Sequence, residues 1–114
     1  EDKNMNLIRV SEVAFADQNL QKNFESLSEN DEIKLFIKRA IKDLETNAFC
    51  GIQIPKRLIP QEYIKKYGIK NLWKYDLPDG WRLVYSVLPQ NKIEILSLII
   101  EWFNHKEYER KFNY

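Results

Sequence analysis

The clearest pattern of hydrophobic and polar positions in this chain is helical and covers residues 28–47. Its apolar residues recur three or four positions apart, as they do on one face of an amphipathic helix. Ser28 and Asp31 resemble a capping pair, and acidic side chains crowd the first turn, where the helix dipole favours them. A shorter helix is predicted after Asp17. The apolar positions are Ile33, Phe36, Ile37, Ala40, Ile41 and Leu44 in the long helix and Leu20, Phe24 and Leu27 in the short one.

Strand patterns lie on both sides of these helices. Residues 6–15, NLIRVSEVAF, mix β-branched and aromatic residues and predict a first strand. Residues 72–77, LWKYDL, and 81–88, WRLVYSVL, flank an Asp-Gly turn and predict a hairpin. Residues 92–103, KIEILSLIIEWF, become apolar on both faces, which is typical of a strand covered on both sides.

The remaining segments show no long period. Residues 52–70 hold two prolines and predict a connection, with a short helix after Pro60. Residues 104–114 predict a polar tail with a last helical turn or two. Residues 1–6 are expected to be a disordered or vector-derived start, with Met5 as the natural first residue. The remainder is expected to form a single domain, because 114 residues suit one compact core.

The predicted fold class is α+β. Two N-terminal helices pack on one face of a small, mostly antiparallel sheet, in the order β-α-α-β-β-β. Strand alternation places Trp81, Leu83 and Tyr85 on the face under the helices. Arg82 then lies on the opposite, open face, together with Lys74 of the preceding strand. The alternative is that Arg82 simply pairs with Asp76 or Asp79, a surface contact worth about 0–1 kcal/mol.

Composition narrows the chemistry. Cys50 and His105 are the only residues of their types, which leaves no internal disulfide and no Cys/His zinc site. We therefore expect a reducing, cytoplasmic location, no metal, no cofactor and no membrane span. The net charge of +1 conceals a basic stretch, residues 46–74, in which Glu62 is the one acidic residue. That stretch predicts either a local anion-binding face or a solvated, lysine-rich loop.

Three segments carry a resemblance to a known family. They are GWRLVYSV (80–87), the apolar IEILSLII (93–100) and the ending EWFNHKEYERKF (101–112). Together with the predicted element order, they resemble the RelE/ParE toxin superfamily, in a RelE-like branch whose chains finish in a His-Lys-x-Tyr motif. The resemblance extends from about Leu7 to the end of the chain.

The resemblance implies a toxin of a type II toxin–antitoxin system. Such toxins are ribosome-dependent, metal-independent mRNA endonucleases (mRNA interferases) that inhibit translation. The ribose 2′-OH attacks the adjacent phosphate, which leaves a 2′,3′-cyclic phosphate and a 5′-OH. This chemistry needs a base, cations around the phosphate and an acid for the leaving oxygen. The implied partners are a cognate antitoxin protein, the ribosome and mRNA.

The resemblance also implies site residues. Arg82 matches the strand arginine that contacts the scissile phosphate, and Lys74 matches the first of two lysines in the preceding strand. Asp76 occupies the place of the second lysine, which is a departure from the family pattern. His105 is a candidate proton carrier because an unperturbed histidine titrates near pH 6.5. Tyr108 could stack on a base or donate a proton.

Each of these assignments has a simpler alternative. His105 can be an exposed residue of the tail, and Tyr108 with Phe112 can be a helical anchor onto the sheet. Glu101 and Glu107 could act as bases or be surface carboxylates. The predicted RNA-binding residues, which would hold phosphates or be plainly solvated, are Lys56, Arg57, Lys65, Lys66 and Lys106.

Two other functions remain open at this point. A ParE-like inhibitor of DNA gyrase would need no RNA-cleaving residues, whereas Lys74, Arg82 and His105 favour the nuclease. A non-catalytic RNA-binding or regulatory member of the same fold is favoured by Asp76 and by the weak overall charge. A fold by itself does not decide among these functions.

Overall fold

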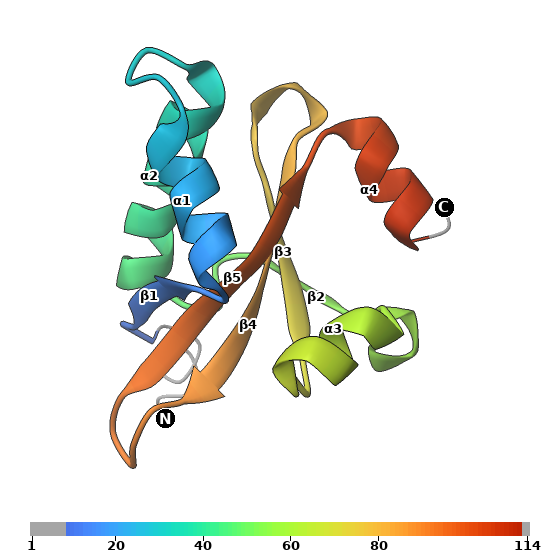
Figure 1. The fold of residues 1–114 in the computed structure, drawn as a ribbon. Coiled ribbons are helices and arrows are strands. Elements are labelled where there is room, and N and C mark those ends of the chain that lie inside the picture. Colours follow the sequence, from blue (N-terminus) through green and yellow to red (C-terminus); the bar gives the residue numbers. More distant parts are fainter. Residues whose placement is uncertain (1–8, 113–114) are drawn as a thin grey trace.

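The computed structural model describes residues 9–112, and these form one five-stranded sheet with helices on both of its sides (Figure 1). The strand order is β1-β5-β4-β3-β2, with β1 parallel to β5 and all other neighbours antiparallel. The elements are β1 (Glu12–Phe15), α1 (Gln18–Ser26), α2 (Glu32–Thr46), β2 (Ile52–Ile54), α3 (Gln61–Tyr67), β3 (Leu72–Asp76), β4 (Arg82–Pro89), β5 (Ile95–Phe103) and α4 (His105–Phe112).

The α+β class and the mostly antiparallel sheet are confirmed, but the predicted arrangement of elements is incomplete. The chain enters the sheet through β1 before either helix, and the full order is β-α-α-β-α-β-β-β-α. The expected connection contains both α3, which follows Pro60 as predicted, and the unexpected strand β2. A strand of three residues is too short to show an alternation, and it exists because β3 pairs with it. The expectation for residues 1–6 lies outside the described part of the chain.

The predicted core under α1 and α2 is confirmed. Leu83 and Tyr85 are fully buried on this face, and Trp81 packs at its margin. The Tyr85 hydroxyl donates to the carbonyl of Ala48 at 2.8 Å and accepts the Gly51 N–H at 3.1 Å. All six apolar positions of the long helix belong to this core: Ile33, Phe36, Ile37, Ala40, Ile41 and Leu44.

The prediction of an open face on the other side of the sheet is wrong. A second apolar core fills that side and is covered by α3, α4 and the segment before α3 (Figure 1). The physical reason is β5, whose apolar run buries Ile99 on one face and Ile100 and Phe103 on the other. The buried residues of this second core are Ile54, Ile59, Tyr63, Ile69, Leu72, Val84, Ile100, Phe103, Tyr108 and Phe112.

A buried lysine holds the connection between α1 and α2. Lys34 is only 5% exposed, and its Nζ donates to the carbonyls of Leu27 at 3.0 Å and Glu25 at 3.4 Å. Carbonyls at the end of a helix lack intrahelical partners, so this lysine satisfies them. It also pairs with Glu29 at 2.7 Å, and together with Lys38 it lowers the pKa of Glu29 to about 2. The stabilisation from these pairs is therefore complete above the ordinary glutamate pKa and is lost as the pH falls toward 2.

We predict that Lys34→Met lowers the free energy of unfolding by about 1–3 kcal/mol, because two carbonyls and a carboxylate lose their donor. Lys38→Met is the matched control, since Lys38 pairs with the same Glu29 from an exposed position. Its effect should stay within about 0.5 kcal/mol. Urea denaturation measures the free energy of unfolding of both variants. Equal losses would show that the buried contacts of Lys34 add no stability beyond that of an exposed ion pair.

Candidate functional site

Three of the predicted site residues, from three different elements, come together at one end of the sheet. Lys74 of β3 and Arg82 of β4 lie over the ring of Tyr108 from α4. The Arg82 guanidinium carbon is 5.4 Å from the ring centroid, and Lys74 Nζ is 6.0 Å from it. Both separations fit cation–π attraction. We call Lys74, Arg82 and Tyr108 the hairpin cluster.

The strand register explains why these cations share a face. Asp76 lies opposite Arg82 in the β3–β4 ladder, and Lys74 lies opposite Val84. Side chains two positions apart point to the same side of a strand, so the residues of both pairs emerge together. The predicted turn is confirmed: Asp79 and Gly80 both have positive φ, 59° and 80°. Aspartate and glycine are residue types that adopt this conformation readily.

Asp76 neutralises both cations of the cluster. Its Oδ1 lies 3.1 Å from Lys74 Nζ and 3.1 Å from Arg82 Nε. The alternative that Arg82 pairs with a neighbouring aspartate is thereby confirmed. The contact to Arg82 is an ion pair without hydrogen-bond geometry, and the Nε–H is buried. The Lys74 and Arg82 side chains are 20% and 19% exposed, against 49% for Asp76, so the carboxylate lies on the solvent side.

Tyr108 lies beneath the cations. Its side chain is 2% exposed, and its ring packs on Phe112 at 4.6 Å and on Phe103 at 6.2 Å between centroids. The alternative of a helical anchor is therefore confirmed for Tyr108 and Phe112. In this arrangement the tyrosine supports Arg82 and Lys74 from below, and α4 is held against the sheet at the hairpin.

His105 lies beside the hairpin cluster, at the start of α4. It is exposed, and its Nε2 is 3.2 Å from the Glu109 carboxylate one turn later. A Cβ added to Gly80 would lie 3.1 Å from the His105 Cβ, so the histidine packs directly on the β3–β4 turn. Arg82 donates from Nη1 to the Gly80 carbonyl at 2.7 Å. The β3–β4 turn thus joins His105 to the cluster, because Gly80 packs against the His105 side chain and its carbonyl accepts the hydrogen bond from Arg82.

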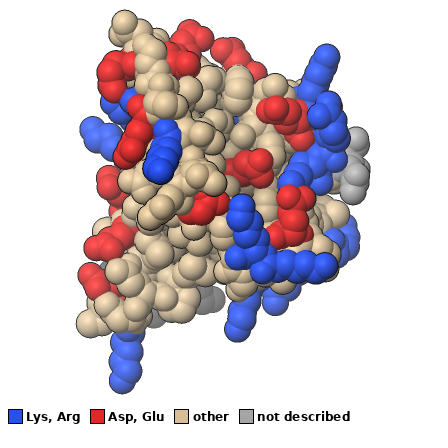
Figure 2. Space-filling view, in the orientation of Figure 1, with Lys and Arg blue, Asp and Glu red and all other residues tan. Residues whose placement is uncertain are grey.

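The predicted RNA-binding residues are all exposed and are not members of the cluster; they lie in the segment before α3, on α3 and on α4. Figure 2 shows lysines and arginines projecting over the α3 and α4 side of the molecule, with carboxylates among them. Lys66 pairs with Asp17 at 3.4 Å, and its pKa is raised by contact with Tyr67 and with that carboxylate. The five predicted RNA-binding residues are Lys56, Arg57, Lys65, Lys66 and Lys106.

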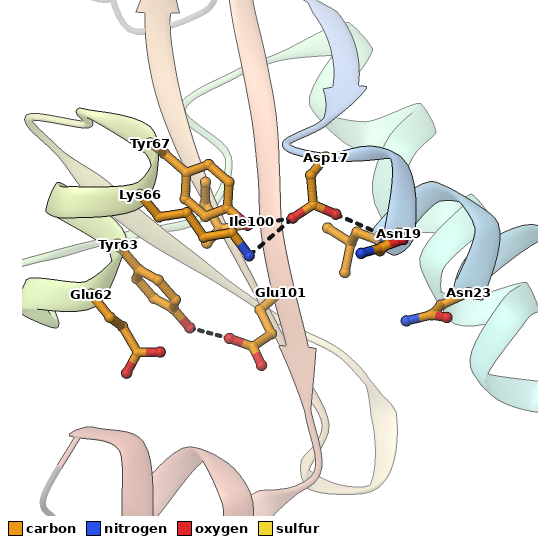
Figure 3. A pocket seen from close by; sticks show the side chains of 10 residues that line it. Asp17, Asn19, Asn23, Glu62, Tyr63, Lys66, Tyr67, Ile100 and Glu101 are labelled. Atoms are coloured by element: carbon orange, nitrogen blue, oxygen red, sulfur yellow. Dashed lines mark hydrogen bonds and ion pairs between the residues drawn. The ribbon is translucent and has the colours of Figure 1, made fainter.

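A polar cleft between α1, α3 and β5 was missed by the sequence analysis (Figure 3). Its volume is about 230 Å³. Tyr63 donates to Glu101 at 2.5 Å, and Tyr67 donates to Asp17 at 2.6 Å. Burial and the neighbouring carboxylate raise the pKa of Tyr63. These contacts tie α3 to β5 and to α1, and Glu101 is engaged in them.

A register shift in the sheet puts Glu101 into this cleft. Val84 pairs with Glu101, whereas the next residue, Tyr85, pairs with Ile99, so Ile100 is an extra residue in β5. Such a bulge redirects the side chains that follow it. No sequence pattern indicates the bulge, because apolar residues stand on both sides of it, at Leu98 and Ile99 and at Trp102 and Phe103.

Within residues 9–112, no three His, Cys, Asp or Glu side chains gather closely enough to hold a metal ion. No helix in that range is both long and apolar enough to cross a bilayer. Comparisons with protein-family models, with curated proteins and with solved structures find no match for this chain.

We predict that Tyr108→Ala lowers the free energy of unfolding by about 3–5 kcal/mol, the range for removing a buried aromatic ring. Tyr108→Phe keeps the ring under Lys74 and Arg82 and should cost far less. Chemical denaturation of both variants measures the difference. A comparable loss in Tyr108→Phe would mean that the hydroxyl, and not the ring, anchors α4.

Proposed function

We propose that this protein is a RelE-like toxin that cleaves mRNA on the ribosome without a metal. The observation that carries the proposal is the convergence of Lys74 and Arg82 on one carboxylate oxygen, at 3.1 Å each. Two cations on neighbouring strands that surround one anionic oxygen form a site suited to a phosphate oxygen. The order of β1, α1, α2 and the β3–β4–β5 meander supports the same family.

The chemistry assigns a role to each part of the site. A base removes the proton of the ribose 2′-OH, and the oxygen attacks the adjacent phosphorus. The extra negative charge on the phosphoryl oxygens is stabilised by Lys74 and Arg82, whose positions are set by the strands and by Tyr108. The bond from phosphorus to the 5′ oxygen breaks, and that oxygen takes a proton. His105, exposed beside the turn, is the group we assign to proton transfer.

The exposed cations outside the cluster fit a role in docking. Phosphate contacts from lysine and arginine supply affinity and orientation without sequence choice. In this proposal, the five cations before α3, on α3 and on α4 contact ribosomal RNA and position the cluster over the mRNA. A cognate antitoxin would cover the cluster in the resting complex, and the protein would act in the cytoplasm.

A second candidate is a non-catalytic RNA-binding member of the same fold. Two observations favour it: Asp76 already neutralises both cations, and Tyr108 is buried instead of facing a substrate. A ParE-like gyrase inhibitor is the third possibility, and none of the distances in the cluster favours it. Mapping mRNA 5′ ends on programmed ribosomes, alongside a DNA supercoiling assay with gyrase, separates the three.

We predict that Arg82→Ala keeps the fold but abolishes growth arrest, because the cation that clamps the phosphate is lost. Arg39→Ala is the control, since it removes an exposed arginine from α2, on the other side of the sheet. Growth is measured at equal expression, and cleavage is measured on programmed ribosomes. Arrest by Arg82→Ala as strong as that of the unchanged protein would exclude this site.

We predict that His105→Ala slows single-turnover cleavage on ribosomes by about 10²–10⁴-fold, the usual contribution of a positioned acid or base. Ribosome binding should stay nearly unchanged, which separates a loss in the chemical step from a loss of docking. Glu109→Ala serves as control, because it breaks the contact to His105 and leaves the imidazole in place. Cleavage at the unchanged rate by His105→Ala would leave the histidine without a chemical role.

A further inference from the structure

Asp76 occupies the place that the proposed function gives to a phosphate oxygen. Its Oδ1 is equidistant from Lys74 Nζ and Arg82 Nε, at 3.1 Å. A carboxylate oxygen and a phosphate oxygen make the same kind of charge-assisted contact with ammonium and guanidinium groups. The protein therefore carries its own anion in the site, on the strand that also carries Lys74.

We propose that Asp76 is a built-in counter-anion, which keeps isolated RNA phosphates out of the hairpin cluster and gives way to RNA held in place by a second surface. The inference rests on the proposed function, in that the displaced carboxylate is replaced by an RNA phosphate. It adds a regulatory role for Asp76 that the cleavage chemistry itself does not require.

The exposure of the three side chains supports displacement. Asp76 is about half exposed, and it lies on the solvent side of two cations that are each about one-fifth exposed. Partly exposed ion pairs are weak, so the carboxylate can swing into water at little cost. The Arg82 Nε–H, buried and without a well-aligned acceptor, gains a proper hydrogen bond if the incoming oxygen approaches along its axis.

Effective concentration explains why the cluster would select RNA held by a second surface over free RNA. An attached group competes at an effective concentration in the millimolar range, set by its short tether. Free RNA at micromolar concentration competes poorly with it and binds several-fold more weakly. RNA bound to the same particle as the protein is itself tethered, so it competes on equal terms. The cluster then opens where mRNA and the exposed cations of the protein are both engaged.

Asp79 provides a matched control within the same hairpin. It carries the same charge, is exposed, and takes part in no ion pair among the described residues. Its positive φ of 59° is one that asparagine also adopts readily. Asp79→Asn therefore changes the net charge as Asp76→Asn does, but leaves the counter-anion in place.

The test measures binding of a short, fluorescently labelled single-stranded RNA, without ribosomes, by anisotropy over a series of salt concentrations. Asp76→Asn should bind about three- to tenfold more tightly than the unchanged protein, the factor that corresponds to one or two partly exposed ion pairs. The slope of log affinity against log salt should steepen by about 0.7, one more phosphate contact on a single strand. Asp79→Asn should stay within about twofold.

Thermal denaturation establishes that the variants are folded, and Asp76→Ser repeats the test with a smaller side chain. Equal gains in Asp76→Asn and Asp79→Asn, or no gain in either Asp76 variant, would overturn the proposal. Cleavage on programmed ribosomes is assayed in parallel to keep the two hypotheses apart. If the unchanged protein cleaves but Asp76→Asn gains no affinity, the counter-anion fails and the nuclease stands. If nothing cleaves yet the gain is seen, the counter-anion stands and the nuclease fails.

Discussion

The burial of β5 on both faces is the constraint on which the rest of this structure depends. Ile99 is fully buried under α1 and α2, while Ile100 and Phe103 are buried under α3 and α4. An antiparallel sheet can leave one face to solvent, but a central strand that is apolar on both faces cannot. The molecule therefore needs a second helical layer, and the segment before β3 and the end of the chain supply it.

That second layer decides where charge can lie. Most of the face is filled by apolar side chains, and the strands place Lys74 and Arg82 at its end, next to the β3–β4 turn. There α4 turns back along the sheet and inserts Tyr108 and Phe112, which places an aromatic ring under Lys74 and Arg82. The first residue of α4, His105, packs against Gly80 at the same end of the sheet. Packing of the second core thus assembles the hairpin cluster from three elements.

The cluster combines attraction for anions with its own neutralisation. Lys74 and Arg82 are each about one-fifth exposed and lie over the Tyr108 ring, whereas Asp76 is about half exposed. The proposed RNA chemistry and the proposed counter-anion both build on this difference in exposure. In contrast, the cleft around Glu101 holds carboxylates that are already engaged: Tyr63 donates to Glu101, and Tyr67 and Lys66 contact Asp17.

The sequence by itself determined most of the elements and the sheet face that meets the long helix, but it missed β2 and the covering of the second face. Strand alternation predicted that Leu83 and Tyr85 face the long helix, and helical spacing predicted which helix residues contact them. Pro60 indicated the start of α3. Periodicity reports which side of an element is apolar, but it does not report what covers that side. Only the tertiary structure decided that α3 and α4 close the second face, that Asp76 reaches both cations, and that Tyr63 meets Glu101. The last pair is 38 positions apart in the chain. Such contacts depend on strand register, on a bulge in β5 and on the packing of separate elements, and no local pattern records these.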